Sequence, residues 1–225
     1  MRRRERPARI LLANLHATSR PAIVVPWLLA QCLTRRVDAV LLQECTDRHA
    51  RYLRRLPRWQ LVREGDEAIL GRRRLLTEDH IVALTGSWRG HHTTAPHAPR
   101  TIPTAVLRGW LTLVDVHFPP GWEHGPEDRR KAGAEYLNAL EDLEMALRTR
   151  DGLLFGGDWN ATRLSKPLRS WWQYAALTQY GHGIDYVAGN PGVYVASWRR
   201  IGRALGMDHD AALYVLRRYP RKASL

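Results

Sequence analysis

The segment Gly157-Asp158-Trp159-Asn160 follows the apolar run Leu153-Leu154-Phe155, with Gly156 between them. A short apolar run beside glycine is typical of a buried strand, so we expect the polar tetrapeptide where that strand ends. Asp158 and Asn160 stand two residues apart, which puts both side chains on one side of an extended backbone. A carboxylate can accept a proton from water, and an amide can donate to a phosphate oxygen. The alternative is an Asx-turn that only connects the strand to the next loop.

Polar groups also mark three other strand-like segments. Gln43-Glu44 ends the apolar run Ala39-Val40-Leu41-Leu42, and the other two segments are Ile184-Asp185-Tyr186 and Met207-Asp208-His209-Asp210. An ordinary surface loop seldom collects Asp, Asn, Glu and His in this way. Metal-assisted hydrolysis of a phosphoester needs that set, because it requires an aimed water, neutralised phosphate oxygens and help for the leaving oxygen.

An ordered set of residues carries a family resemblance: Asn14, Gln43-Glu44, His117, Gly157-Asp158-Trp159-Asn160, Ile184-Asp185-Tyr186 and Asp208-His209. From about Arg9 to Leu216 the chain resembles the endonuclease/exonuclease/phosphatase superfamily, which includes deoxyribonuclease I, repair nucleases and sphingomyelinases. The ordered set is specific for the superfamily and not for a substrate. The resemblance implies an α/β (α+β) fold with two packed, mostly antiparallel β-sheets flanked by helices. This is the four-layer deoxyribonuclease I-like sandwich, with its site at one rim.

The resemblance implies a metal site. In this interpretation Glu44 binds the metal, and Asp208 joins it or orients His209. Mg²⁺ suits the task because it takes oxygen ligands, keeps several waters and usually binds only one or two protein carboxylates. We therefore expect Mg²⁺, or Mn²⁺ in its place, as the cofactor. The alternative for Glu44 is a capping or surface role.

The resemblance also implies the proton chemistry. Asp158 would polarise the attacking water or assist the leaving group, and Asn160 would hold Asp158 and the phosphate. The imidazolium of His209 would stabilise charge on the phosphoryl group or donate a proton. Asp185 would hold the other ring nitrogen of His209. The alternative for His209 is a solvent-facing side chain in an acidic loop.

Two further residues, His117 and Asn14, match the family pattern, and one residue, His16, departs from it. His117 ends the apolar strand Leu111 to Val116, and the resemblance implies that it contacts the leaving group or the phosphate. Asn14 would support the phosphate or the catalytic aspartate. The alternative for both is a polar residue at the rim without a catalytic role. His16 stands where repair enzymes often have a second metal-binding carboxylate, which weakens the repair-endonuclease interpretation.

The chain is strongly basic, with a formal net charge of +13 and a pI of about 10.6. Basic side chains neutralise phosphates and release counterions, so this balance favours a polyanionic partner. The alternative is codon bias, because lysine occurs only at Lys131, Lys166 and Lys222 and every other basic residue is arginine. Bias explains the choice of arginine better than it explains the excess of positive charge. We expect nucleic acid, and DNA in particular, as the partner of a monomeric protein.

A basic segment follows the Gly-Asp-x-Asn motif. Arg163, Lys166 and Arg169 precede the pair Trp171-Trp172. Such a loop could hold a nucleic-acid backbone while Trp171 and Trp172 stack on or wedge between bases. The alternative is that both tryptophans pack over the rim of the sheet. Arg100, just before a strand, is a further candidate for a phosphate contact.

The length of 225 residues suits one domain with an ample core. We expect a basic N-terminal arm over residues 1–8, a single endonuclease/exonuclease/phosphatase domain over residues 9–217 and a basic tail over residues 218–225. No apolar stretch approaches the roughly 18 residues of a membrane span, and the run after the basic start is too short for a signal peptide. Cys32 and Cys45 are too few for a disulfide framework. These features predict a cytoplasmic protein without a membrane segment.

Periodicity predicts the individual elements. We expect helices over residues 21–33, 46–56 and 126–150, and a loop over residues 86–103. The expected strands are residues 9–15, 38–43, 59–63, 67–70, 81–84, 104–108, 110–117, 153–155, 184–188, 193–197 and 212–216.

The combined patterns predict a Mg²⁺- or Mn²⁺-dependent phosphoesterase, and we interpret it as a nuclease that hydrolyses phosphodiester bonds in DNA. One alternative is a phosphatase or phosphodiesterase that acts on a small phosphorylated molecule. The other is a non-catalytic nucleic-acid-binding protein on the same fold. The steep salt dependence of polyanion binding would distinguish the nuclease from the first alternative.

Overall fold

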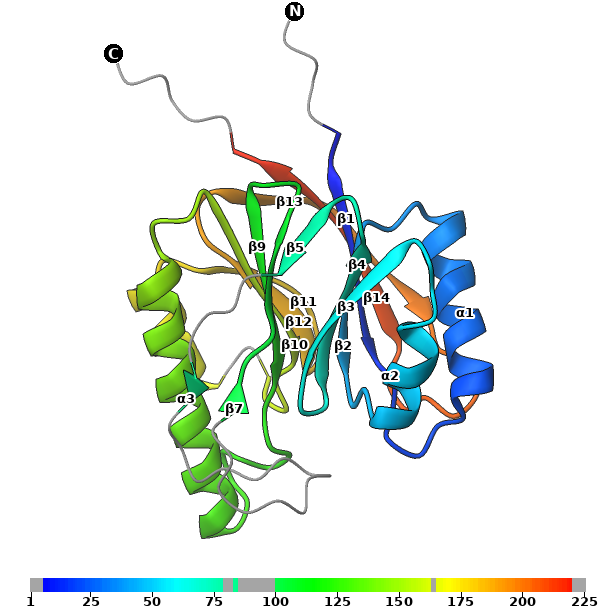
Figure 1. Cartoon of the computed structure of the whole chain (residues 1–225). Coiled ribbons are helices and arrows are strands. Elements are labelled where there is room, and N and C mark those ends of the chain that lie inside the picture. The colour runs from blue at the N-terminus through cyan, green and yellow to red at the C-terminus, as the bar shows by residue number, and fades with distance from the viewer. Residues whose placement is uncertain (1–5, 79–82, 85–99, 163–164, 220–225) are drawn as a thin grey trace, which may run out of the picture.

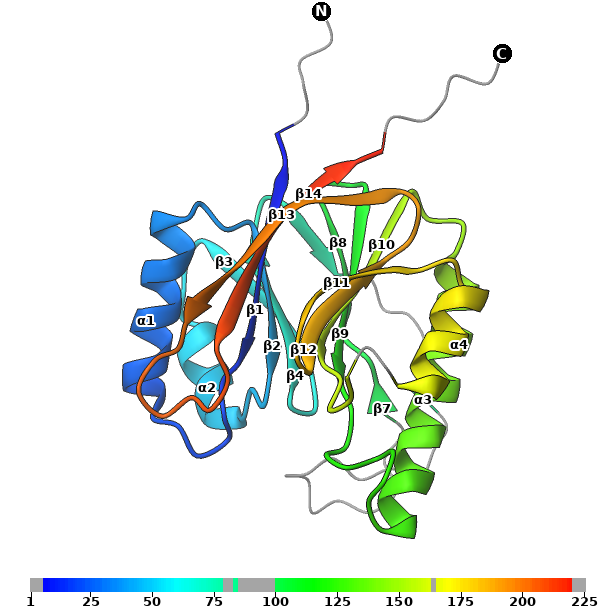
Figure 2. The ribbon, with the colours of Figure 1, turned by 180° about the vertical axis from the view of Figure 1, so that it is seen from behind.

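The structure is a computed structural model that describes residues 6–78, 83–84, 100–162 and 165–219. Two six-stranded β-sheets pack face to face, and helices cover their outer faces (Figures 1 and 2). The described part of the chain therefore confirms the expected four-layer α/β sandwich. Within that part, no helix has the length and apolar character needed to cross a membrane.

The first sheet has the strand order β13-β14-β1-β2-β4-β3. Its strands are β1 (Ala8–Asn14), β2 (Ala39–Gln43), β3 (Trp59–Glu64), β4 (Glu67–Arg72), β13 (Val193–Gly202) and β14 (Ala211–Arg218). Helices α1 (Pro21–Thr34) and α2 (Asp47–Leu53) lie on its outer face (Figure 1).

The second sheet has the order β11-β12-β10-β9-β8-β5. Its strands are β5 (Leu76–Glu78), β8 (Thr104–Leu107), β9 (Leu111–His117), β10 (Gly152–Asp158), β11 (Thr178–His182) and β12 (Asp185–Gly189). Helices α3 (Glu127–Leu147) and α4 (Lys166–Tyr174) cover it from outside (Figure 2). The short strands β6 (Ala83–Leu84) and β7 (Arg100–Thr101) pair with each other.

The central strands are apolar on both faces because both faces are covered. In β1, Ile10 and Leu12 face the second sheet and pack with Leu154 of β10. The alternate residues Leu11 and Ala13 pack with side chains of α1. A third apolar cluster joins the outer face of the second sheet to α3 and α4. Because side chains alternate between the two faces of a strand, each central strand contributes to two separate cores.

The register of the strands determines where the polar strand ends meet. Parallel pairing places Asn14 beside Gln43, at the ends of β1 and β2. In the second sheet, Asp158 pairs with His117 on one side and with Asp185 on the other. Gly157 permits the close approach of β10 and β9, because an added Cβ would overlap the carbonyl oxygen of Val116. The ends of both sheets therefore lie at one edge of the sandwich.

Several element boundaries differ from the prediction. The segment expected as a basic loop after the Gly-Asp-x-Asn motif contains helix α4, so that prediction is wrong. Ser165 is its N-cap and accepts a hydrogen bond from the backbone N–H of Leu168 at 3.4 Å. The three expected helices form, but α2 and α3 end several residues earlier than predicted, at Leu53 and Leu147. Of the strand expected over residues 81–84, residues 81–82 lie outside the described residues.

Candidate active site

Asp158 ends β10 and is only 2% exposed. Its Oδ1 accepts a hydrogen bond from the backbone N–H of Asn160 at 2.9 Å. Asn160 adopts a left-handed conformation with φ of 47°, and its side-chain amide donates to the carbonyl oxygen of Phe118 at 2.7 Å. Asn160 therefore holds Asp158 through its backbone, while its side chain anchors the neighbouring strand end. Asp158 therefore makes an Asx-type contact with Asn160, and other polar groups also converge on it.

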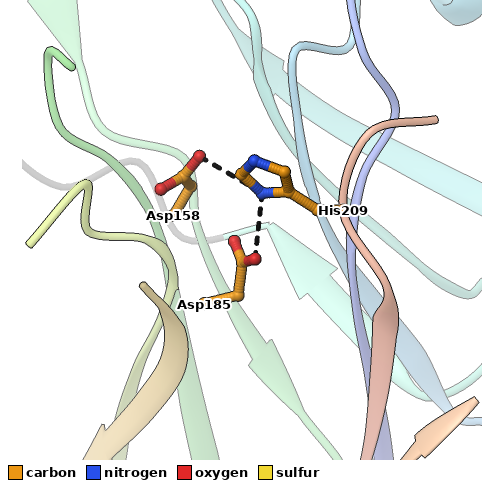
Figure 3. Close-up of side chains that lie close together, drawn as sticks. All are labelled: Asp158, Asp185 and His209. Carbon is orange, nitrogen blue, oxygen red and sulfur yellow. Dashed lines mark ion pairs between the residues drawn. The ribbon is translucent and has the colours of Figure 1, made fainter. Parts of the chain in front are cut away.

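His209 lies between two aspartates (Figure 3). Its Nδ1 is 2.9 Å from Oδ2 of Asp185 and 3.6 Å from Oδ2 of Asp158. The hydrogen bond with Asp185 is the main cause that raises the pKa of His209 to about 9, although partial burial opposes the shift. The ring is therefore an imidazolium at neutral pH. Because Nδ1 is held by Asp185, Nε2 is the nitrogen that can face a ligand.

The carboxyl group of Asp158 is more basic than an ordinary aspartate. Burial is the largest cause that raises its pKa to about 6, and the charge of Asp185 adds to the shift. The positive rings of His117 and His209 act in the opposite direction. Asp158 is thus still ionised at neutral pH, with a proton affinity closer to that pH than a surface aspartate has.

Asn14 joins the two sheets at this edge. Its Nδ2 donates to Oε1 of Glu44 and to Oδ2 of Asp158, each at 3.2 Å. Its Oδ1 accepts from the backbone N–H of His16 at 3.0 Å. The backbone N–H of Ala17 donates to Oε2 of Glu44 at 2.8 Å, so the Glu44 carboxylate is held from two directions.

Asp208 is exposed and lies between two histidines. Its Oδ2 is 3.8 Å from Nε2 of His209 and 4.0 Å from Nε2 of His16. His16 thus lies beside Asp208, on the turn that follows β1. The metal predicted for Glu44 and Asp208 would therefore approach the turn between Asn14 and Ala17.

Two donor sets at this edge could hold a cation. Ligand atoms of Asp158, Asp185 and His209 all lie within 4.8 Å of one another. This set includes a nitrogen that already contacts Asp185, and its mixed donors suit a transition metal better than Mg²⁺. The half-buried Glu44 carboxylate, fixed by Asn14 and Ala17, supplies the oxygen donors that Mg²⁺ prefers. The residues present therefore fit a hard cation on the Glu44 side of the edge.

His117 is buried at the end of β9 and forms a second histidine–aspartate pair. Its Nδ1 is 3.5 Å from Oδ2 of Asp66, and both side chains are almost fully buried. Burial tends to lower the pKa of His117, but the hydrogen bond and charge of Asp66, with the charges of Asp158 and Glu67, raise it to about 9. Sequence reasoning missed Asp66. The signal was available, because Asp66-Glu67 opens the apolar strand β4.

A buried polar network lies beneath this edge. The Gln43 amide donates to Oδ1 of Asp115, and the backbone N–H of Ala68 donates to Oδ2 of Asp115 at 2.9 Å. Burial and the charge of Glu67 raise the pKa of Asp115 well above its ordinary value. Tyr136 of α3 donates to Oε1 of Glu67 at 2.9 Å. Because Gln43 and Asp115 belong to different sheets, this network connects the two sheets. It lies close to His117, which is on the same strand as Asp115.

The predicted substrate-binding residues separate into two groups. Trp171 and Trp172 are only 2% and 5% exposed, and both rings pack against Trp159. This burial favours the packing alternative over stacking on bases, because the faces of both rings are covered within the protein. Lys166 and Arg169 are exposed on α4. Arg163 and the side chain of Arg100 lie outside what the structure describes.

Lys166 borders a pocket of about 550 Å³ beside this edge. The loop that follows β9 contributes Trp122 and His124, and α3 contributes Arg130. Trp122 donates a hydrogen bond to the carbonyl oxygen of Trp159 at 3.0 Å, which ties the pocket wall to the Gly-Asp-x-Asn motif. His124, Arg130 and Lys166, from three segments, thus line this pocket together with the acidic Glu123.

The geometry agrees with comparisons to known proteins. The Endonuclease/Exonuclease/phosphatase family model matches residues 4–209. A comparison with curated protein sequences found no match. The structure of an endonuclease/exonuclease/phosphatase from Bacteroides vulgatus is similar, with 15% identity and a TM-score of 0.70 over 96% of this chain and 100% of that chain.

Two other similar structures differ in what they act on or bind. D. rerio TDP2 complexed with single strand DNA product has 16% identity and a TM-score of 0.64, covering 95% of this chain and 100% of that chain. Mannosyl-6-phosphatase Bt3783 of Bacteroides thetaiotaomicron has 13% identity and a TM-score of 0.65, covering 93% of this chain and 99% of that chain. At these identities the likenesses establish the fold and not the substrate. Because the family model spans every strand end described above, the chain belongs to the Endonuclease/Exonuclease/phosphatase family.

Proposed function

We propose that this protein is a metal-dependent phosphodiesterase that acts as a nuclease on DNA. The observation that carries the proposal is the convergence of Asp158, Asp185 and His209 from three separate segments, with their ligand atoms within 4.8 Å. A buried aspartate beside a half-buried aspartate and histidine is costly to assemble, so such a cluster favours a chemical role. The exposed basic residues around it favour an anionic substrate.

The proton chemistry follows from the contacts. Asp158 accepts a proton from the attacking water, a role that its raised basicity supports. Nδ1 of His209 is held by Asp185, so Nε2 donates to a phosphoryl oxygen or to the leaving oxygen. His117, held by Asp66, supplies a second positive charge beside Asp158. Asn14 and the backbone of Asn160 orient Asp158 for these steps.

Glu44, together with Asp208, is the proposed holder of Mg²⁺ or Mn²⁺. When bound, the cation would neutralise charge on the non-bridging phosphate oxygens. Asn14 fixes both Glu44 and Asp158, so this residue sets the position of the proposed metal ligand relative to the proposed base.

DNA is the substrate that the surface favours. Lys166 lines the 550 Å³ pocket, Arg169 is exposed on the same helix α4, and the chain carries a net charge of +13. A similar protein, TDP2, is described in complex with single strand DNA product. A small phosphorylated substrate is the second candidate, because a similar structure is a mannosyl-6-phosphatase and the pocket is large enough for a sugar phosphate.

Single-turnover cleavage of duplex and single-stranded DNA, beside a panel of phosphomonoesters, tests the proposal. We expect Mg²⁺-dependent DNA cleavage that falls about 10²–10⁴-fold in His209→Ala and in Asp158→Asn, with folding intact. The double variant should lose much less than the product of both losses, because the groups act as a unit. Arg51→Ala, at an exposed arginine on α2, is the control. Turnover of phosphomonoesters without DNA cleavage would favour the second candidate, and unchanged rates in both single variants would contradict the assignment of the site.

A further inference from the structure

A second pocket lies at the edge of the first sheet opposite the candidate active site. It has a volume of about 560 Å³, and its lining consists of Leu33, Arg58, Trp59, Arg72, Arg73 and Arg74. We call it the arginine pocket. Trp59 pairs with Arg72 across β3 and β4, and Gly71 pairs with Ala39 at the start of β2. Glu44 follows the other end of β2, so the strand separates the arginine pocket from the proposed metal site.

The floor of the arginine pocket is fixed. Nε of Arg72 donates to the carbonyl oxygen of Val37 at 2.9 Å, and its guanidinium lies 5.6 Å from the centre of the Trp59 ring. The backbone N–H of Arg73 donates to the carbonyl oxygen of Arg58 at 3.0 Å. These contacts fix the Arg72 side chain and the backbones of Arg58 and Arg73 relative to one another.

The charge of the arginine pocket is uncompensated by carboxylates. Its lining contains no acidic residue, and among the described residues no carboxylate forms an ion pair with Arg58, Arg73 or Arg74. Guanidinium groups placed together repel one another unless an anion lies between them. Their planar forks match phosphate oxygens well. The chemistry therefore points to a ligand with phosphate groups.

We propose that the arginine pocket binds phosphates of a nucleic-acid strand at a distance from the site of cleavage. The inference rests on the proposed nuclease function and extends it to a second contact on the same substrate. The five residues of β2 span roughly 15 Å, at about 3.3 Å per residue. A nucleic-acid strand is long enough to reach both edges, whereas a small phosphoester is not. An anionic membrane fits less well, because Leu33 is the one strongly exposed apolar side chain in the lining, at 66%.

The test is binding of the full-length Arg73→Ala/Arg74→Ala variant to a fluorescent DNA single strand of about 30 nucleotides, over a series of salt concentrations. The measurements contain EDTA, so that affinity is recorded without cleavage. We expect a higher dissociation constant and a salt slope reduced by roughly one unit for each lost phosphate contact. The matched control is Arg51→Ala/Arg150→Ala, which removes two exposed arginines outside the pocket and should change both quantities less.

The outcomes separate the arginine pocket from the catalytic proposal. Equal affinity and salt slope in wild type and Arg73→Ala/Arg74→Ala, with thermal unfolding unchanged, would overturn the inference. A variant that keeps DNA affinity but loses binding to phosphatidylserine vesicles would also overturn it, in favour of a membrane contact. A wild-type protein that cleaves no DNA, but whose DNA affinity falls in the variant, would contradict the nuclease proposal and support the pocket as a DNA-binding site.

Discussion

The side-chain amide of Asn14 donates a hydrogen bond of 3.2 Å to the carboxylate of Asp158, although the two residues belong to different sheets. The same nitrogen also donates to Glu44, so both of its hydrogens are used within the protein. Asn14 therefore positions two carboxylates, and its amide has no proton left for a phosphate. This contact favours one of its two predicted roles, support of the aspartate rather than of the phosphate.

Replacement of Asn14 by aspartate should be more harmful than replacement by alanine. Asn14→Asp removes both donors and adds a third negative charge beside Glu44 and Asp158. Loss of a hydrogen bond to a charged group costs about 1.5–3 kcal/mol, so we expect Asn14→Ala to lose roughly 10- to 100-fold in single-turnover rate. Asn14→Asp should lose more and should unfold at a lower temperature. A rate for Asn14→Asp equal to that of wild type would contradict the bridging role.

Metal binding should depend on Glu44. Its two carboxylate oxygens accept from Asn14 and Ala17, and Glu44→Gln keeps the size of the side chain but removes the negative charge and one acceptor. We expect Mg²⁺ to raise the unfolding temperature of the wild type and to have little effect on Glu44→Gln, because a ligand that binds only the folded state stabilises it. Glu64→Gln, an exposed glutamate at the end of β3, is the control. Full activity of Glu44→Gln in EDTA would remove the metal mechanism.

The pair of His117 and Asp66 should make stability depend on pH. The pKa of His117 is raised in the folded protein from 6.5 to about 9. The stabilisation is therefore fully present below about pH 6.5 and is lost as the pH rises through about 9, on the order of 1–3 kcal/mol. Asp66→Asn should be less stable at pH 6 and should lose less stability than the wild type up to pH 9. Parallel pH profiles of unfolding free energy in both proteins would contradict the pairing.

Trp171 should contribute to folding and not to substrate affinity. It is 2% exposed and packs edge-on against Phe155 and beside Trp159. Trp171→Ala should cost about 3–5 kcal/mol of unfolding free energy, as large-to-small core substitutions do. Trp198→Ala, at a 38% exposed tryptophan on β13, is the control and should cost much less. A stable Trp171→Ala variant with weakened DNA binding would restore the stacking interpretation.

Local patterns predicted most of the sheet strands and the ends that carry Asp158, Glu44 and His117. Each of these strands is mostly apolar and stops at or just before a polar residue, so the signal lies within a few neighbouring positions. The basic, aromatic-rich sequence of helix α4 predicts a loop, so the helix could not be found from this sequence pattern. Its apolar face, Leu168 with the two following tryptophans, becomes evident only once the sheet that it covers is known.

The contacts between the site residues were harder to predict than the identities of those residues. Asp66 and His117 are far apart in the chain, and their contact arises because β4 and β9 belong to facing sheets. The contact of Gln43 with Asp115 likewise crosses between the sheets. No local pattern encodes such a contact. The catalytic and metal-binding roles of the site residues stay predictions, and the experiments above are designed to test them.

The place of β14 in the first sheet has a consequence for how the candidate site assembles during synthesis. β14 pairs between β13 and β1, so β1 acquires this neighbour only when a strand about 200 residues later in the chain has been made. His209 stands just before β14 and reaches Asp158 and Asp185 only when that strand docks. A nascent chain can therefore build the second sheet with both aspartates and still lack the imidazolium. Completion of the first sheet and assembly of the Asp158–Asp185–His209 cluster are therefore linked, because β14 contributes to both.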